Sequence, residues 1–349
     1  MKRSSKLVAS LFALALGAAL VVGCTANMDA NQTEEPQNTP EPVATSVTVT
    51  DAAGRQVTLD QPVDSILTVY GSKYILALGL GDKMVNGSTK DFELAVCPSL
   101  ANGITFGSEQ MNAETIAQIN PDVFIHKATA TELMGALDNL GVNSIGIYME
   151  TPEEVCATLE LLGTALGVPD RAAELITYYQ DLMNTGARLT ANIPQDERPT
   201  AILMGNTIGK VAHGSMLQSI MIESAGGINL AKDVQGEGTW PVVGVEQIFE
   251  WDPDFIFIMN STGRDYDAQT ILNDPAWANL TAVQNGHVYV VPSDLDSWEY
   301  PCVQSGLGTI WMISKMYPDL ITDAQLETYV NEFYDFVYGV QFTREELNY

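Results

Sequence analysis

Apolar and polar positions follow two periods along the chain from Ser46 onward. Short, nearly continuous apolar runs, typical of buried strands, are separated by longer segments in which apolar residues recur every three or four positions, as in helices. Strands are expected at residues 65–70, 83–88, 121–126, 144–149, 200–205, 253–259 and 287–292. Because apolar strands alternate with helices, the pattern indicates an α/β fold with parallel sheets that helices cover on both faces.

Helical periodicity is most extended at residues 168–193, where Leu175, Tyr179 and Leu182 share one stripe. A helix of roughly two dozen residues would span about 35 Å at about 1.5 Å per residue, which is long enough to connect two lobes. Other helices are expected at 71–81, 112–120, 129–141, 151–167, 214–227 and 245–251, and from 305 onward. A hairpin at 46–63, turned at Ala53 and Gly54, precedes them.

One phrase of the sequence occurs twice. AETIAQINPDVFI at 113–125 returns as VEQIFEWDPDFIFI at 245–258, so that Glu114 matches Glu246. In both copies a Pro-Asp pair follows seven positions after the glutamate, immediately before an expected strand. The repeat predicts two lobes of similar topology, at 46–167 and 194–349, joined by the helix at 168–193.

The first 23 residues have the pattern of a bacterial lipoprotein signal. A basic start with Lys2, Arg3 and Lys6 is followed by a short apolar run that ends at Gly23-Cys24. Cys24 is therefore the expected lipidation site, and the polar, proline-containing residues 24–45 form a flexible tether. A plain secretory signal with a chance cysteine is the alternative. We expect a protein anchored by lipid at the extracytoplasmic face of the cell membrane.

The chain is strongly acidic. It has 16 Lys and Arg against 44 Asp and Glu, a formal net charge of −28, and three of its basic residues lie in the signal. Such a surface repels nucleic acid and anionic lipid, so membrane contact is expected only through the anchor.

Three cysteines remain after Cys24, and their spacing matches no zinc or iron–sulfur pattern. Cys156 lies on the apolar side of a predicted helix and is interpreted as a core residue. Cys97 and Cys302 lie in loops beside prolines, and either a bridge or two free thiols is compatible with the sequence.

Ligands of open α/β sheets bind outside the carboxyl ends of the strands. This rule selects segments such as 86–92 and 294–300, and within the selected set cations and aromatic residues predominate. The candidate ligand-binding residues are Tyr70, Lys73, Lys90, His126, Lys127, His213, Trp240, Arg264, Trp298 and Tyr300. Trp298 and Tyr300 alternate with polar residues and could line a cleft together, or they could anchor their loop on the C-terminal helix.

Enzyme signatures are missing from the sequence. It contains no Gly-x-Ser-x-Gly elbow, no P-loop and no Gly-x-Gly-x-x-Gly after a first strand. With three histidines in all, a His-rich cage for bare zinc or manganese is not indicated either. No catalytic residue, metal site or resident cofactor is expected.

Several phrases in order resemble one family. The lipobox at Cys24, the hairpin VTDAAGRQVTL, the phrase MNAETIAQINPDVFI, the single connecting helix and DSWEYPCVQSGLGTIWMISKMYP together resemble the extracytoplasmic substrate-binding proteins of metal-chelate ABC importers. The resemblance implies two Rossmann-like lobes with parallel sheets joined by one long connecting helix, the class III fold. It implies a monomer whose partners are a permease dimer with its ATPase and a small-molecule chelate.

The resemblance also implies roles for the repeat and for the ligand site. In that family one glutamate on each lobe docks into the permease, and the matching positions here are Glu114 and Glu246. A local role in stabilising the helix N-terminus is the alternative. An anionic iron chelate such as a siderophore would use the four cations Lys73, Lys90, Lys127 and Arg264, together with aromatic residues.

Other ligands and functions stay open. Cobalamin is one alternative, haem is another because His126, His213 and Met216 could ligate its iron, and molybdate or tungstate could bind N–H groups at Gly71-Ser72 and Gly214-Ser215. Rivals from other classes are a nitrogenase-like or chelatase-like enzyme on the same fold and a surface receptor without a permease.

Overall fold

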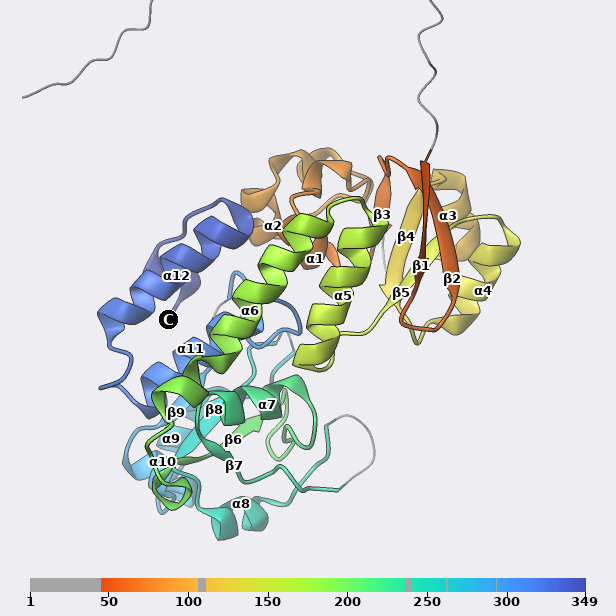
Figure 1. Ribbon diagram of the computed structural model, residues 1–349. Helices are drawn as coiled ribbons and strands as arrows, with labels where there is room; N and C mark the ends of the chain where they lie inside the picture. The colour runs from red at the N-terminus through yellow and green to blue at the C-terminus, as the bar shows by residue number, and fades with distance from the viewer. Residues whose placement is uncertain (1–44, 106–110, 236–239, 262, 293) are drawn as a thin grey trace, which may run out of the picture. The chain divides into compact units, whose positions relative to one another are not determined.

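The described part of the protein consists of two parallel sheets, one antiparallel hairpin and the helices packed around them. The computed structural model describes residues 45–105, 111–235, 240–261, 263–292 and 294–349 (Figure 1). The predicted signal, the lipidation site and the predicted tether as far as residue 44 lie outside the described residues, whereas Thr45, the last residue of the predicted tether, begins β1.

The first lobe is built on three parallel strands in the order β3-β4-β5. These are β3 (Ile66–Thr68), β4 (Val123–Lys127) and β5 (Ser144–Ile147), and the hairpin of β1 (Thr45–Thr50) and β2 (Gln56–Gln61) precedes them. The helices of this lobe are α1 (Ser72–Ala77), α2 (Asp91–Val96), α3 (Ala113–Ile119), α4 (Thr131–Asn139) and α5 (Pro152–Ala165).

The second lobe has four parallel strands in the order β7-β6-β8-β9. These are β6 (Thr200–Met204), β7 (Ile228–Asn229), β8 (Phe255–Ile258) and β9 (Val288–Val290). Its first helices are α7 (Leu217–Ser224), α8 (Val245–Trp251), α9 (Ala268–Asn273) and α10 (Thr281–Gln284). After β9 the chain forms α11 (Gln304–Met316), α12 (Asp323–Tyr338) and α13 (Arg344–Leu347).

One helix, α6 (Pro169–Leu189), leads from the first lobe to the second. Pro169 occupies its first turn, where the missing N–H costs no helical hydrogen bond. In Figure 1, α6 runs beside α5, and it also packs against α11. The helix is shorter at both ends than the predicted 168–193, because residues after Leu189 turn toward the short 3₁₀ segment Gln195–Glu197.

Both faces of each sheet are buried. In the first sheet Ile66 and Ile125 face one hydrophobic cluster, whereas Leu67 and Phe124 face another. The first of these clusters is continuous through α6 and α11 to one face of the second sheet, where it includes Phe257. This is why the strands are apolar without alternation, as a doubly covered parallel sheet requires.

The repeated phrase forms the same unit in both lobes. In the first, the Asp122 carboxylate accepts the N–H groups of Asp64 and Ser65, each at 2.8 Å, and the Asp122 N–H donates to Ser65 Oγ. In the second, the Asp254 carboxylate accepts the N–H and the hydroxyl of Thr200, each at 2.8 Å, and the Asp254 N–H donates to Thr200 Oγ1. Each aspartate therefore ties the start of its own strand to the start of the neighbouring strand.

Residues 83–88 form no strand, contrary to the prediction from their pattern. Met84 makes one parallel bridge to Ile66, and Asn86 makes another to Ile104. The Asn86 side-chain oxygen accepts the N–H of Thr68 at 3.0 Å, so a side chain takes the place of the next ladder bond. A regular fourth strand does not develop.

Candidate functional site

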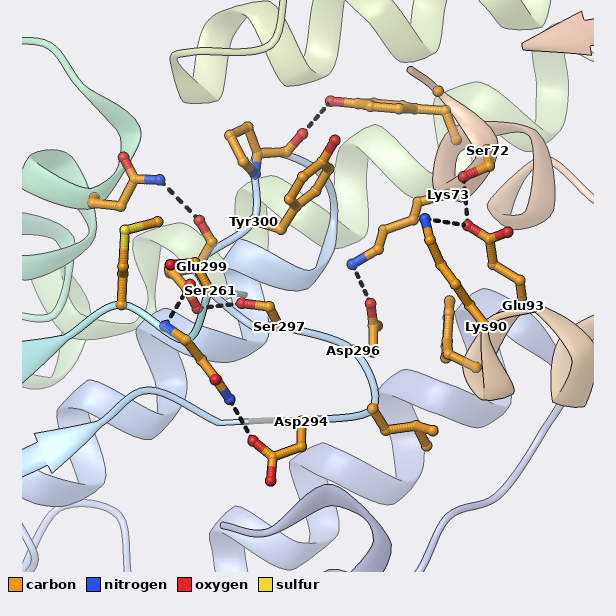
Figure 2. A pocket seen from close by; sticks show the side chains of 18 of the residues that line it. Ser72, Lys73, Lys90, Glu93, Ser261, Asp294, Asp296, Ser297, Glu299 and Tyr300 are labelled. Atoms are coloured by element: carbon orange, nitrogen blue, oxygen red, sulfur yellow. Dashed lines mark hydrogen bonds and ion pairs between the residues drawn. The ribbon is translucent and has the colours of Figure 1, made fainter. Parts of the chain in front are cut away.

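A cavity of about 640 Å³ lies where strands of both lobes end. It is lined by Val69, residues 71–74, Lys90, Phe92 and Glu93 from the first lobe, and by Gln218, 259–261, 294–297 and 299–301 from the second. The lining residues within 69–74, 259–261 and 294–301 follow the carboxyl ends of β3, β8 and β9, the position at which open α/β sheets bind ligands. Lys90, Phe92 and Glu93 come from the start of α2, and Gln218 comes from α7 (Figure 2).

One ion pair in the lining of the cavity joins the two lobes. The Lys73 ammonium, at the start of α1, contacts the carboxylate of Asp296, whose side chain is fully buried (Figure 2). Lys73 Nζ also lies 4.6 Å from the ring centroid of Tyr300. Burial opposes the charge of Lys73, but the Asp296 carboxylate outweighs burial, and the pKa of Lys73 is raised above its usual value.

The second lysine of the cavity is paired as well. Lys90 Nζ lies 3.2 Å from the Glu93 carboxylate, which also accepts the Ser72 hydroxyl at 2.8 Å. Burial alone would raise the pKa of Glu93, but hydrogen bonds, including that from Ser72, and the charge of Lys90 together lower it. The Glu93 carboxylate is therefore ionised at neutral pH and offsets the Lys90 charge.

Glu299 is a buried carboxylate without a lysine or arginine partner among the described residues. Only 2% of it is exposed, and its oxygens accept the Asn260 N–H at 2.8 Å and the Ser297 hydroxyl at 2.5 Å. Burial raises the pKa of Glu299 to about 7, and these hydrogen bonds only partly oppose the shift. The group is thus shared between its two protonation states near neutral pH.

Further hydrogen bonds fix the loop after β9. The Tyr74 hydroxyl donates to the Pro301 carbonyl at 3.1 Å, and Gln218 Nε2 donates to the Glu299 carbonyl at 3.0 Å. Asn260 Nδ2 donates to the Asp294 carboxylate at 2.9 Å. The loop is therefore held by α1 of the first lobe and by α7 and the β8 exit of the second.

The structure brings three of the predicted ligand-binding residues to this cavity, namely Lys73, Lys90 and Tyr300. Trp298 lies in the core instead. It is fully buried, and its indole N–H donates to the Tyr334 hydroxyl of α12 at 2.9 Å. The expected alternation fails because residues 297–300 form a turn, in which the Tyr300 N–H donates to the Ser297 carbonyl.

Tyr70, His126 and Lys127 form a separate cluster after β3 and β4. The Tyr70 and His126 rings meet edge to face at 5.1 Å, and Lys127 Nζ lies 4.8 Å from the Tyr70 ring centroid. Lys127 also pairs with Glu150 at 3.5 Å. Burial lowers the pKa of His126, so its ring is neutral at pH 7. None of the three lines the cavity.

His213, Trp240 and Arg264 also lie outside the cavity lining. His213 belongs to a turn in which its carbonyl accepts the Met216 N–H, and α7 begins only at Leu217. Trp240 packs against the main hydrophobic cluster. Arg264 donates at 3.1 Å to the carbonyl of Met259, which is itself a cavity-lining residue.

The sequence matches one protein family over most of the part that forms these lobes. Residues 67–295 match the family described as periplasmic binding protein. The chain belongs to the periplasmic binding protein family. The matched residues include most of the segments that line the cavity.

Relatives from this family have diverse named ligands. The chain is 22% identical to the molybdate-binding protein MolA of Haemophilus influenzae over 84% of this chain and 91% of that protein. It is 25% identical to the Fe(3+)-citrate-binding protein YfmC of Bacillus subtilis, with the same two coverages. A periplasmic solute-binding protein from Veillonella parvula has a TM-score of 0.74 and 27% identity, over 87% of this chain and 97% of that one.

In the described part of the chain, no group of three or more His, Cys, Asp or Glu side chains could hold a metal ion. Cys97, Cys156 and Cys302 are free thiols with different partners. Cys97 bonds with Asp82 and Ser99, Cys156 accepts from Gln180 at 3.9 Å, and Cys302 donates to Gln304.

The acids that line the cavity were not among the predicted site residues. Glu93, Asp296 and Glu299 were not singled out, although segments 86–92 and 294–300 were selected as strand ends. In a chain with 44 acidic residues, an acid in a loop carries little information. Glu93 and Glu299 each follow an aromatic residue, Phe92 or Trp298, and that neighbour was the available signal.

Proposed function

We propose that this protein is the solute-binding lipoprotein of an ABC importer, and that it captures an iron chelate of siderophore type between its lobes. The observation that carries the proposal is the cavity at the strand ends of a periplasmic binding protein. Its volume of about 640 Å³ falls within the range of roughly 300–1,000 Å³ common for small-molecule sites.

The composition of the cavity supports a chelate over a bare ion. No described group of His, Cys, Asp or Glu side chains is suited to hold a metal, so a metal would arrive with its own ligands. Aromatic and apolar side chains, including Phe92, Met259 and Tyr300, offer contact surface for an organic chelator. The separated cysteines also count against an enzyme with a metal cluster.

An oxyanion such as molybdate is less well supported, although one relative is named for it. Binding through backbone N–H groups would need two helix starts facing the cavity. Gly71 and Ser72 line it, but Gly214 and Ser215 do not, and α7 begins two residues after Ser215. Haem would lack an axial histidine, since His126 and His213 lie outside the lining.

Delivery to a permease and anchoring by lipid complete the proposal. Glu114 and Glu246 are exposed second residues of α3 and α8, so both are accessible to a docking partner. Two relatives are named as ABC transporter substrate-binding lipoproteins. No helix in the described part of the chain is long and apolar enough to cross a membrane. Lipidation at Cys24 would supply the attachment.

Fluorescence titration tests the proposed ligand class. The full-length chain in detergent would be titrated with ferric hydroxamate and catecholate chelates, cobalamin, haem and molybdate, with tryptophan emission as the readout. We expect saturable quenching by at least one ferric chelate at micromolar concentration or below. Saturation by cobalamin, haem or molybdate alone would replace the ligand, and no saturation by any iron chelate would contradict the proposal.

A further inference from the structure

The fixed charges of the cavity are unbalanced toward the negative. Its lining contains two bases, Lys73 and Lys90, and four acids, Glu93, Asp294, Asp296 and Glu299. No arginine is among the described residues that line the cavity. The four cations expected to attract an anionic ligand are therefore not gathered there, because Lys127 and Arg264 lie elsewhere.

Both lysines of the cavity already have carboxylate partners. The Asp296 carboxylate is fully buried and pairs with Lys73, and the Glu93 carboxylate is 5% exposed and pairs with Lys90. An anionic ligand that displaced either carboxylate from its ammonium would leave a buried acid without its lysine. Uncovering a buried charge in this way is strongly unfavourable.

The two remaining acids have no cation of their own among the described residues. Asp294 is exposed at the cavity and accepts hydrogen bonds only from neutral amides, Asn260 Nδ2 at 2.9 Å and Asn348 Nδ2 at 3.4 Å. Glu299 is buried and accepts only from the Asn260 N–H and the Ser297 hydroxyl. Hydrogen bonds hold both carboxyl groups in place, and Glu299, with a pKa of about 7, is partly ionised at neutral pH.

We infer that the cavity selects metal chelates without net negative charge and favours cationic ones. The Asp294 carboxylate is the group that makes the affinity depend on the charge of the chelate. The inference rests on the proposed function and narrows its ligand class. A positive group on the chelate would lie in the field of Asp294 and of the partly ionised Glu299, whereas a negative group would meet these acids and two ammonium groups that already have carboxylate partners. Tyr300 and Phe92 would contact the uncharged part of the ligand.

One chelate with an exchangeable side group tests this. Ferrioxamine B, a ferric tris-hydroxamate, carries one positive charge on a pendent amine; its N-acetyl derivative is neutral and its N-succinyl derivative is negative. The iron coordination is the same in all three. Dissociation constants would be measured by calorimetry on the full-length chain in detergent, at pH 7 and low salt. We expect the cationic complex to bind about tenfold more tightly than the negative one, with the neutral complex between them.

A matched pair of variants assigns the effect to the cavity. Asp294→Asn keeps the size and hydrogen-bonding oxygen of the side chain, and should shrink the ratio between cationic and negative complexes about threefold. Asp319→Asn removes the same charge from an exposed position outside the cavity lining and should leave that ratio unchanged.

Two results would overturn the inference in distinguishable ways. Tightest binding of the negative complex, equal binding of all three, or an unchanged ratio in Asp294→Asn would reject charge selection while ferric-chelate binding stands. Binding of none of the three complexes would overturn both the inference and the proposed iron-chelate function.

Discussion

At the residue scale, burial raises the pKa of two neighbouring acids of the cavity that have different partners. Asp296 and Glu299 lie three residues apart and both are buried. Asp296 has the Lys73 ammonium beside it, whereas Glu299 makes hydrogen bonds to Asn260 and Ser297. Burial raises the pKa of both carboxyl groups and outweighs these favourable contacts, and the pKa of Glu299 reaches about 7.

This shift predicts a pH dependence of stability. The pKa of Glu299 rises from 4.5 in the unfolded chain to about 7 in the folded protein, so folding favours the protonated form. The resulting stabilisation is complete below about pH 4.5 and is lost as pH rises through about 7, by on the order of 3 kcal/mol.

Denaturant unfolding of wild type and Glu299→Gln at a series of pH values measures it. The glutamine variant is neutral throughout, so the free energy of unfolding of wild type should fall relative to the variant from pH 5 to pH 8. A difference that stays constant over this interval would mean that Glu299 is ionised without cost in the folded protein.

Only some of the site residues could be predicted from the sequence. Lys73 and Tyr300 could be predicted because they lie in the segments that follow β3 and β9, and strand ends form ligand sites. Trp298 was misplaced because alternation of sides was assumed for residues that form a turn. The partner of Lys73 was not predictable, since it lies more than two hundred positions away on the other lobe.

At the element scale, the internal repeat has a structural cause. In each lobe a seven-residue helix ends in a residue with left-handed backbone, Asn120 or Asp252, at φ of 53° or 43°. A proline follows, and then an aspartate, Asp122 or Asp254, bonds to the start of the neighbouring strand. The sequence spacing is conserved between the lobes because helix exit and strand start must be joined in the same way.

Equivalent substitutions in the two copies should therefore have similar effects. Asp122→Ala and Asp254→Ala each remove two hydrogen bonds to a charged acceptor and should lower the free energy of unfolding by about 1–3 kcal/mol. Asp254 is the more buried of the two and should show the larger loss. Chemical denaturation with Asp319→Ala as control measures this. A loss below about 0.5 kcal/mol in both variants would deny the shared role.

Most strands and helices followed from hydrophobic periodicity, because both faces of each sheet are buried. One predicted strand does not form and one observed strand was not predicted, each for a local reason. Residues 83–88 replace a ladder bond by the Asn86 side chain, and β7 has only two residues, too few for any periodicity to be recognised.

At the scale of the whole molecule, two chain segments join the lobes in addition to the contacts at the cavity. One is α6. The other is the C-terminal segment, in which Tyr338 of α12 packs edge to face on Phe92 of α2 at 5.1 Å, and Arg171 of α6 donates to the Phe336 carbonyl at 2.7 Å. No sequence pattern revealed that a helix after the second sheet would contact the first lobe. Two connections favour small relative movement of the lobes during binding.

A rigid binding protein would present fixed docking points to its permease. Charge reversal at both repeated glutamates, Glu114→Lys with Glu246→Lys, should abolish chelate uptake in cells that carry the importer while leaving the dissociation constant unchanged. Glu132→Lys is the matched control, since Glu132 is also an exposed acid in the first turn of its helix. Weakened ligand binding in the double variant, or equal loss of uptake in the control, would contradict a docking role.

The central claim is that a ferric chelate occupies the cavity between the lobes. Anomalous diffraction at the iron absorption edge, from crystals grown with the tightest-binding ferric chelate, tests it most directly. We expect one strong iron peak inside the cavity that is lined by Lys73, Asn260 and Tyr300. An iron peak elsewhere on the protein, or none in crystals that contain the chelate, would contradict it.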